Sequence, residues 1–384
     1  MFRRFILIII VLLIFYNIGF FIISAMKPAL ATTSVYKPKR LAIYYGWPSV
    51  VNGAGGDTNK ATEELAFFDV IVLGDGIEHP SHGDHVKTEA VIGNLRAQGK
   101  EVFGYVDMGA STQNLPIATA EQYVDEWTAM GVSGIFWDDA GFDFHVSRDR
   151  QNTLVNYSHN KGLAVILNAW NPDDVLTGSP LIPYTSNDYC LIESWMISQA
   201  YPNLYEDLTQ WQTRANKYFN NRKTSSVQLA AISSGPNEDN PFQYAWWGAT
   251  MYGIDAFGYT NIEYSSYGSE TNILRKINNP LPDLIGNSFL DEQVVRVSSN
   301  QYKRLTDKGI IFIENNGEKK GYFQSKTGDA GATSYTENDY IIWKCEFLNN
   351  GICANPKTNN QSDFNQDGIV DLVDFEIWRE NTTL

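Results

Sequence analysis

The sequence predicts an α/β fold, a (β/α)8 barrel followed by a small β-rich region, and three observations lead to it. Short apolar runs rich in β-branched and aromatic residues alternate with longer amphipathic stretches, and eight such runs occur between residues 40 and 263. Several amphipathic stretches end in glycine, the usual residue just beyond a helix. Near-continuous apolar strands separated by helices indicate a parallel sheet covered on both faces. Eight repeats fit a closed barrel better than an open doubly wound sheet.

The elements of the barrel follow one another along residues 40–280. The predicted strands are residues 40–47, 68–76, 100–109, 134–141, 163–170, 188–196, 226–234 and 254–263. The predicted helices are residues 59–68, 88–99, 118–131, 148–162, 205–221 and 243–253. No glycine-rich phosphate-binding motif follows any of these strands, which disfavours a nucleotide-binding enzyme.

Beyond residue 280 the pattern changes to short strands divided by Gly, Asn and Asp turns, without helices between them. These strands are residues 293–299, 308–316, 319–325 and 339–347. They predict a small antiparallel domain over 281–353, which serves either as a structural cap or in carbohydrate binding. Cys345 and Cys353 flank an Asn-Asn-Gly turn, so their spacing allows a local disulfide. A polar linker, residues 354–362, follows.

The N-terminal segment, residues 1–31, has the features of an export signal. Arg3 and Arg4 precede an apolar run over 5–26, and an Ala-Leu-Ala site ends at Ala31. The run is also long enough for an uncleaved membrane anchor, so both interpretations stay open. In either case the rest of the chain is expected outside the cytoplasm, secreted or at the cell surface.

Composition narrows the classes of partner. The formal net charge is −15 and the Lys and Arg residues are scattered, so no nucleic-acid-binding surface is expected. Aromatic residues make up 13% of the chain, with 10 Trp and 21 Tyr. This content fits either a large core with ordinary surface tyrosines or a cleft whose rings stack on sugars.

The C-terminal segment 363–384 contains oxygen ligands at the spacing of an EF-hand-type calcium loop. The predicted Ca²⁺ ligands are Asp363, Asn365, Asp367, Ile369 through its carbonyl, Asp371 and Asp374. Gly368 occupies the sharp turn, and an apolar helix begins inside the loop. The alternative is an Asx-rich turn that caps this helix. The loop resembles a single dockerin repeat, and this resemblance implies calcium binding and a cohesin-like partner protein.

Polar side chains at the ends of the predicted strands form the candidate active site, because barrel enzymes place catalytic groups there. The candidate catalytic residues are Asp138, Glu193 and Asp139. The candidate substrate-binding residues are Tyr45, Asp75, Tyr105, Asp107, Asn168, Trp170 and Asn261. Any single acid in this set has an alternative role as the N-cap of the helix that follows it.

Asp138 and Glu193 are the predicted catalytic pair. They end the fourth and sixth strands, and side chains of one interior layer come from alternate strands, so both face one cavity. Glu193 interrupts an apolar strand, where burial is expected to raise its pKa. A glutamic acid of raised pKa beside an ionised aspartate is what glycoside hydrolysis requires, without a cofactor. If the facing of the fourth strand were shifted by one residue, Asp139 instead of Asp138 would face the cavity and take the catalytic role.

Two other functions are open. The barrel is either catalytic or a degenerate barrel that binds glycan at the cell surface without cutting it. His79, His82 and His85 form a third possibility, a metal site of the kind a polysaccharide deacetylase uses, although Pro80 and Gly83 break their spacing.

Two segments resemble a known family. "GIFWDD" at 134–139 and "VFGYVDMG" at 102–109 are similar to the spherulin-4-like and endo-α-1,4-polygalactosaminidase barrels. The resemblance implies a glycoside hydrolase that acts with retention on a polysaccharide or cell-wall glycan containing amino sugars. It also implies that Asp138 is the catalytic aspartate and nucleophile, and that Glu193 is the acid/base. The segment "GDGIEHPSHG" at 74–83 departs from the family pattern, which weakens the inference about substrate.

Overall fold

A computed structural model describes residues 37–223, 225–262, 264, 273–278, 285–325, 347, 370 and 372–381. The chain divides into two compact units, residues 1–34 and 35–384. The predicted export segment, the two cysteines of the predicted disulfide and all predicted calcium ligands except Asp374 lie outside the described residues. Within the described residues, no helix has the length and apolar character needed to span a membrane.

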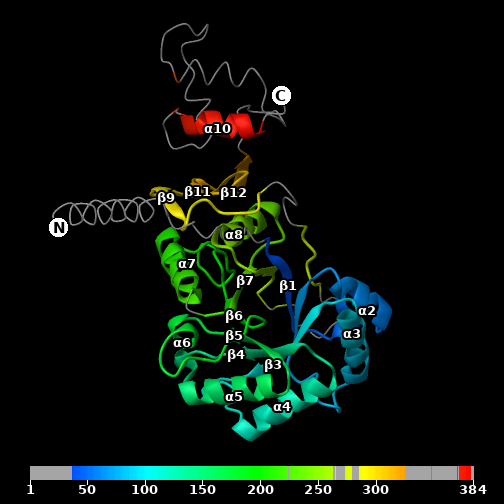
Figure 1. Ribbon diagram of the computed structural model, residues 1–384. Coiled ribbons are helices and arrows are strands. Elements are labelled where there is room, and N and C mark those ends of the chain that lie inside the picture. Colours follow the sequence, from blue (N-terminus) through cyan, green and yellow to red (C-terminus); the bar gives the residue numbers. More distant parts are fainter. Residues whose placement is uncertain are drawn as a thin grey trace, which may run out of the picture. The chain divides into compact units, whose positions relative to one another are not determined.

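Eight parallel strands close into a barrel in the order β1 to β8, with β8 paired to β1 (Figure 1). The strands are β1 (Lys39–Tyr44), β2 (Val70–Leu73), β3 (Glu101–Asp107), β4 (Gly134–Asp138), β5 (Ala164–Asn168), β6 (Tyr189–Ile192), β7 (Gln228–Ser234) and β8 (Ala256–Thr260). Seven lie within predicted strands and β1 begins one residue before its predicted range, so the predicted (β/α)8 barrel is confirmed. Strand order follows chain order because each helix returns the chain to the start of the next parallel strand.

Helices surround this barrel. The six predicted helices are present as α2 (Thr58–Leu65), α3 (His85–Ala97), α4 (Ile117–Ala129), α5 (Arg148–Asn160), α7 (Leu208–Arg222) and α8 (Asp239–Tyr252). Side-chain caps start three of them: the Asp57 carboxylate accepts from the Asn59 and Lys60 amides, Asp207 caps α7 in the same way, and the Ser147 hydroxyl caps α5. Three short helices were not predicted, because so few residues carry no periodic signal: η1 (Pro48–Gly53), η2 (Phe142–Phe144) and α6 (Asp173–Leu176).

The barrel has two separate apolar layers. One fills its interior and includes Ile43, Phe103, Phe136, Ile166 and Leu191. The other lies between the strands and the helices, and it is the larger cluster. Because successive side chains of a strand point to opposite faces, membership of the inner layer fixes the direction of every other side chain along that strand.

A second sheet contains β9 (Val295–Ser298), β10 (Gln301–Leu305), β11 (Gly309–Asn316) and β12 (Glu318–Ser325), all antiparallel. It packs on α8, where the Phe323 and Trp247 rings stack with centroids 6.2 Å apart. The sequence pattern missed β10 because its Lys and Arg residues obscure the strand pattern. Arg304 on β10 is nevertheless buried: its guanidinium donates to the Met251 carbonyl at 2.7 Å and lies over the Phe289 ring.

Two predictions about the C-terminal part have different outcomes. A helix, α10 (Leu372–Asn381), begins inside the predicted calcium loop as the sequence predicts, and Asp374 in its first turn is buried. The predicted strand over 339–347 falls almost wholly outside the described residues.

Candidate active site

Five predicted site residues point into the same end of the barrel interior. Phe103, Phe136, Ile166 and Leu191 belong to the inner layer. The residues two positions further along the chain therefore face inward at the carboxyl ends of β3, β4, β5 and β6. These residues are Tyr105, Asp138, Asn168 and Glu193, and Tyr45 follows Ile43 of β1 in the same way.

Strand facing also separates the two adjacent aspartates. Asp138 is the last residue of β4, and its neighbour Trp137 points outward into the helix layer. Asp139 has left the strand: its backbone adopts φ +51°, an unusual conformation for a residue other than glycine. Asp138 is therefore the inward-facing acid of this pair.

One amide joins the two predicted catalytic carboxylates. Asn168 Nδ2 donates to Asp138 Oδ1 at 2.7 Å and to Glu193 Oε2 at 3.1 Å. These two oxygens are therefore at most 5.8 Å apart, the sum of the two distances. For the ~120° angle between the two N–H bonds of an amide group, the oxygens lie about 5 Å apart. The buried Asn168 thus fixes both carboxylates at one site.

Three tyrosines form the wall beside this pair. The Tyr264 hydroxyl donates to Glu193 Oε1 at 3.0 Å, and burial, followed by the nearby charge of Asp138, raises the pKa of Tyr105. The Tyr45 ring contacts both of the other rings, with centroids 5.5 Å apart in each case. Tyr264 was missed by sequence reasoning, which selected Asn261 from the same loop. Its only sequence signal is an aromatic residue shortly after the eighth strand.

Burial of a crowded acid cluster sets the electrostatics. Burial, followed by the charge of Asp139, raises the pKa of Asp138 to about 7, although the Asn168 hydrogen bond opposes this rise. Burial, followed by the charge of Asp107, raises the pKa of Asp139 to about 6. The sequence did not single out Asp138 for a raised pKa. Its pKa rises because Asp138 lies at the strand end inside the barrel, with another carboxylate next to it.

The raised pKa of Asp138 predicts a pH-dependent effect of Asp138→Asn on stability. A carboxyl whose folded pKa exceeds its unfolded value of 3.8 binds protons more tightly in the folded state, so folding stability falls as pH rises from about 4 to about 7. Asparagine removes this loss. The stability of the variant relative to the wild type should increase by about 2–3 kcal/mol between pH 4.5 and pH 8.

Denaturant unfolding at both pH values measures this difference. Asp143→Asn, at an exposed aspartate on the same loop, is the control and should show a smaller change between the two pH values. A pH-independent difference for Asp138→Asn would contradict the raised pKa.

The other predicted substrate-binding residues lie around this centre with different contacts. Asp107 is buried and accepts from the Thr112 hydroxyl at 2.8 Å, so it orders the loop after β3. Asp75 accepts from Gln113 Nε2 at 2.7 Å and links the loops after β2 and β3. Trp170 is 49% exposed in the loop after β5, and Asn261 follows β8 at the same end of the barrel.

The three loop histidines have separate partners. His79 Nδ1 lies 2.5 Å from Glu126 Oε2, and His85 Nδ1 lies 2.9 Å from the Ile77 carbonyl oxygen. The His82 ring packs edge-on against Trp47. Within the described residues, no three His, Cys, Asp or Glu side chains are grouped so that they could hold a metal ion. We interpret these histidines as supports for the loop between β2 and α3.

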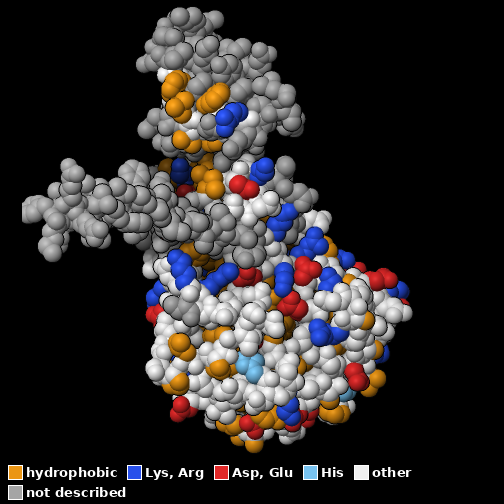
Figure 2. All heavy atoms as spheres, viewed as in Figure 1, with side chains coloured by type: hydrophobic (Ala, Val, Ile, Leu, Met, Phe, Trp, Pro, Cys, Tyr) orange, Lys and Arg blue, Asp and Glu red, His pale blue; other side chains and the backbone are white. Residues whose placement is uncertain are grey.

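Surface charge around the barrel is mixed. On the face shown in Figure 2, acidic and basic side chains are interspersed over the described residues, without a continuous basic stripe. This face does not have the charge pattern of a nucleic-acid-binding surface.

Comparisons with known proteins found similarity to solved structures alone. No family model matches the chain, and no curated protein is similar to it. Among solved structures it is similar to the glycoside hydrolase domain of PelA from Pseudomonas aeruginosa, with TM-score 0.42 and 16% identity, covering 62% of this chain and 100% of that chain. A GH18 chitinase from Pseudoalteromonas aurantia has TM-score 0.39 and 11% identity, covering 60% and 97%. A dihydrodipicolinate synthase from Agrobacterium tumefaciens has TM-score 0.36 and 12% identity, covering 59% and 71%.

Proposed function

We propose that this protein is a glycoside hydrolase that cleaves a polysaccharide, with Asp138 and Glu193 as its two catalytic carboxylates. The observation that carries the proposal is the Asn168 amide, which donates to both side chains at once. Two carboxylates whose amide-bound oxygens lie about 5 Å apart, at the carboxyl end of a barrel, have the arrangement that cleavage of a glycosidic bond needs. The tyrosine wall supplies an amphipathic surface for a sugar ring beside them.

The chemistry needs one carboxyl in each role. One carboxylic acid gives its proton to the glycosidic oxygen as the bond to the anomeric carbon breaks, and the other carboxylate attacks that carbon. Water then displaces the enzyme-bound sugar, with the first residue taking a proton from the water. The charge of Asp139 lies close enough to raise the pKa of Asp138, and it would favour a positively charged transition state.

The spacing of the carboxylates predicts retention of configuration. A separation of about 5 Å matches retaining enzymes, whereas inverting enzymes hold the groups about 6.5–9.5 Å apart to admit a water molecule. The first product should therefore have the anomeric configuration of the bond that was cut. Proton NMR in the first minutes of hydrolysis, before mutarotation, measures this, and an initially inverted product would contradict the proposed geometry.

The roles within the pair have two assignments. The family resemblance makes Asp138 the nucleophile and Glu193 the acid/base. The pKa of about 7 instead suits Asp138 to proton donation in the empty site. Azide rescue of Asp138→Gly and Glu193→Gly separates these assignments. Rescue of the nucleophile variant gives a glycosyl azide of inverted configuration, and rescue of the acid/base variant gives a retained one.

A depolymerisation assay tests the function as a whole. The full chain is incubated with α-1,4-linked galactosamine polymers, N-acetylated and free, and with cell-wall extracts, and new reducing ends are counted. The double variant Asp138→Asn/Glu193→Gln is the inactive control and should release no new reducing ends. A wild-type protein that binds these glycans but releases no sugar would instead be a glycan-binding surface protein.

Three further proposals rest on the sequence. We propose that the chain is exported, and that it is secreted or held at the cell surface by its N-terminal segment. We also propose that the loop 363–374 binds Ca²⁺ and that a cohesin-like protein is its partner.

A further inference from the structure

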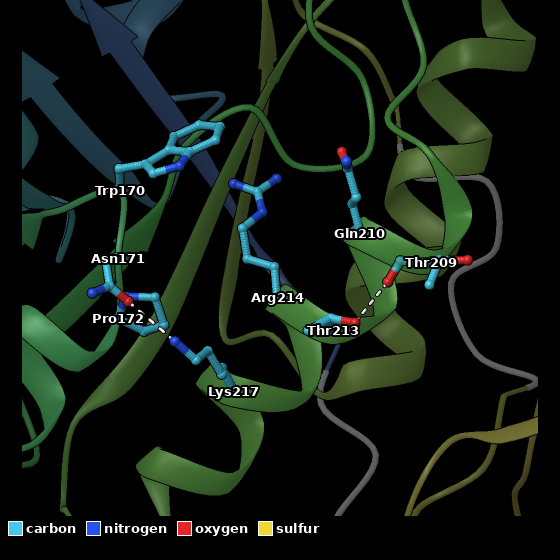
Figure 3. Close-up of a pocket in the computed structure, with 8 residues that line it drawn as sticks. All are labelled: Trp170, Asn171, Pro172, Thr209, Gln210, Thr213, Arg214 and Lys217. Atoms are coloured by element: carbon cyan, nitrogen blue, oxygen red, sulfur yellow. Dashed lines mark hydrogen bonds between the residues drawn. The ribbon is translucent and has the colours of Figure 1, made fainter.

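A cavity lies between the loop after β5 and one face of α7 (Figure 3). Its volume is about 560 Å³. The loop contributes Trp170, Asn171 and Pro172, and the helix contributes Thr209, Gln210, Thr213, Arg214 and Lys217. Most of the helix residues recur at spacings of three and four, so they form one face of α7.

Two connections tie this cavity to the catalytic pair. Trp170 follows Asn168, the residue that bridges the two carboxylates, by two positions. Arg214 Nη1 donates to the Glu193 carbonyl at 2.7 Å, and Nη2 donates to the Ser194 carbonyl at 2.8 Å. The same arginine therefore lines the cavity and holds the backbone that carries Glu193.

Trp170 is placed so that a sugar ring could stack on its side chain. Its side chain is large and apolar, yet 49% of it is exposed, and it borders a cavity. The Arg214 guanidinium lies 4.8 Å from its ring centroid and holds the indole in place. In Figure 3 these two side chains point toward each other, Trp170 from the loop and Arg214 from the helix. A rigid, half-exposed indole offers a flat apolar face to the C–H side of a pyranose.

The charges of the cavity are already balanced. Arg214 pairs with Glu206 at 2.6 Å, and Lys217 pairs with Asp173 at 2.6 Å. These two cations are the only charged residues of the lining. The remaining polar groups are hydroxyls and amides, including the exposed Gln210 amide. Such a lining suits a ligand with hydrogen-bonding groups and no net charge.

We infer that this cavity is a sugar subsite for an uncharged pyranose unit, a neutral hexose or an N-acetylated hexosamine, stacked on Trp170. The unit belongs to the same saccharide chain that is cut between Asp138 and Glu193, so the inference rests on the proposed function. The inferred subsite narrows the substrate class of the proposed function to saccharides with an uncharged unit near the bond that is cut.

Binding to an inactive protein tests the subsite apart from catalysis. Calorimetry measures the affinity of the full-length Glu193→Gln protein for N-acetylated α-1,4-galactosamine oligosaccharides, from the disaccharide to the heptasaccharide. Adding Trp170→Ala should weaken binding of the longer oligosaccharides about tenfold or more and leave the disaccharide nearly unchanged. Trp170→Phe should keep most of the affinity.

Trp47→Ala is the matched control, because Trp47 is a second exposed tryptophan, 42% exposed, in the loop after β1. It should change affinity by less than about threefold. Equal losses for the two alanine variants, or no loss for Trp170→Ala, would overturn the subsite while leaving the catalytic proposal intact. If no oligosaccharide binds and the wild type cuts none, both proposals fail. If the wild type hydrolyses none of these oligosaccharides but their binding still depends on Trp170, only the catalytic proposal is overturned.

The charge of the ligand is tested with the same proteins. The affinity for N-acetylated oligosaccharides should change less than about twofold between 0.05 and 0.5 M salt. The presence of Trp170 should increase the affinity for oligosaccharides with free amino groups by a smaller factor than the affinity for N-acetylated ones. Tighter Trp170-dependent binding of the charged oligosaccharides would overturn the assignment to an uncharged sugar.

Discussion

Glu193→Gln and Asp138→Asn are each expected to lower the turnover of the polysaccharide by about 10³-fold or more. Each substitution keeps the shape of the side chain but removes either the transferable proton or the attacking carboxylate. The Asn168 amide contacts both positions, so the site should keep its shape while losing its chemistry. Initial rates from reducing-end release measure the loss, and circular dichroism checks the fold.

A matched substitution separates this effect from a general change of charge. Asp149→Asn removes one negative charge from an exposed aspartate in the first turn of α5, the helix that follows β4. Turnover should stay within about threefold of the wild type, since the change affects only an exposed charge. Retention of most activity by either pair variant would refute the assignment of the catalytic carboxylates.

Gly104→Ala is expected to destabilise the barrel by about 3 kcal/mol or more. A Cβ atom at residue 104 of β3 would lie 2.1 Å from Cδ2 of Trp127, far inside van der Waals contact. Trp127 is fully buried and cannot swing into solvent. Its indole also donates to the Tyr105 carbonyl at 3.0 Å, so displacing the ring would disturb the strand that carries Tyr105. Denaturant unfolding measures the loss of stability.

Gly93→Ala on α3 is the control for this change. No heavy atom lies within 4 Å of the added Cβ, and the backbone is helical. Alanine is a better helix former than glycine, so this variant should gain up to about 1 kcal/mol. Equal effects of the two substitutions would contradict the tight packing of Trp127 on Gly104.

The barrel could be predicted from sequence because its strands are buried on both faces. Such strands have continuous apolar sequences, and each helix between them is long enough to show its period. The choice of Asp138 over Asp139 could also be made from the alternation of side chains along the fourth strand. Phe136 in the inner layer fixes Asp138 inward, but the end of β4 at Asp138 and the left-handed Asp139 appear only in the structure.

The remaining features of the site depend on contacts between distant segments. Tyr264 reaches Glu193 from the loop after β8, and Arg214 reaches the Glu193 carbonyl from α7. Neither contact leaves a local pattern in the sequence. The pKa of Asp138 likewise depends on burial and on neighbouring charges in three dimensions, so residue type and strand position could not predict its rise.

The central claim is that a saccharide is cut between Asp138 and Glu193. A crystal structure of the Glu193→Gln protein with a bound oligosaccharide tests it most directly. We expect the scissile bond to lie between residues 138 and 193, with each side chain within about 3.5 Å of one of its atoms. An oligosaccharide that binds elsewhere on the barrel, with no glycosidic bond near these two side chains, would contradict the claim.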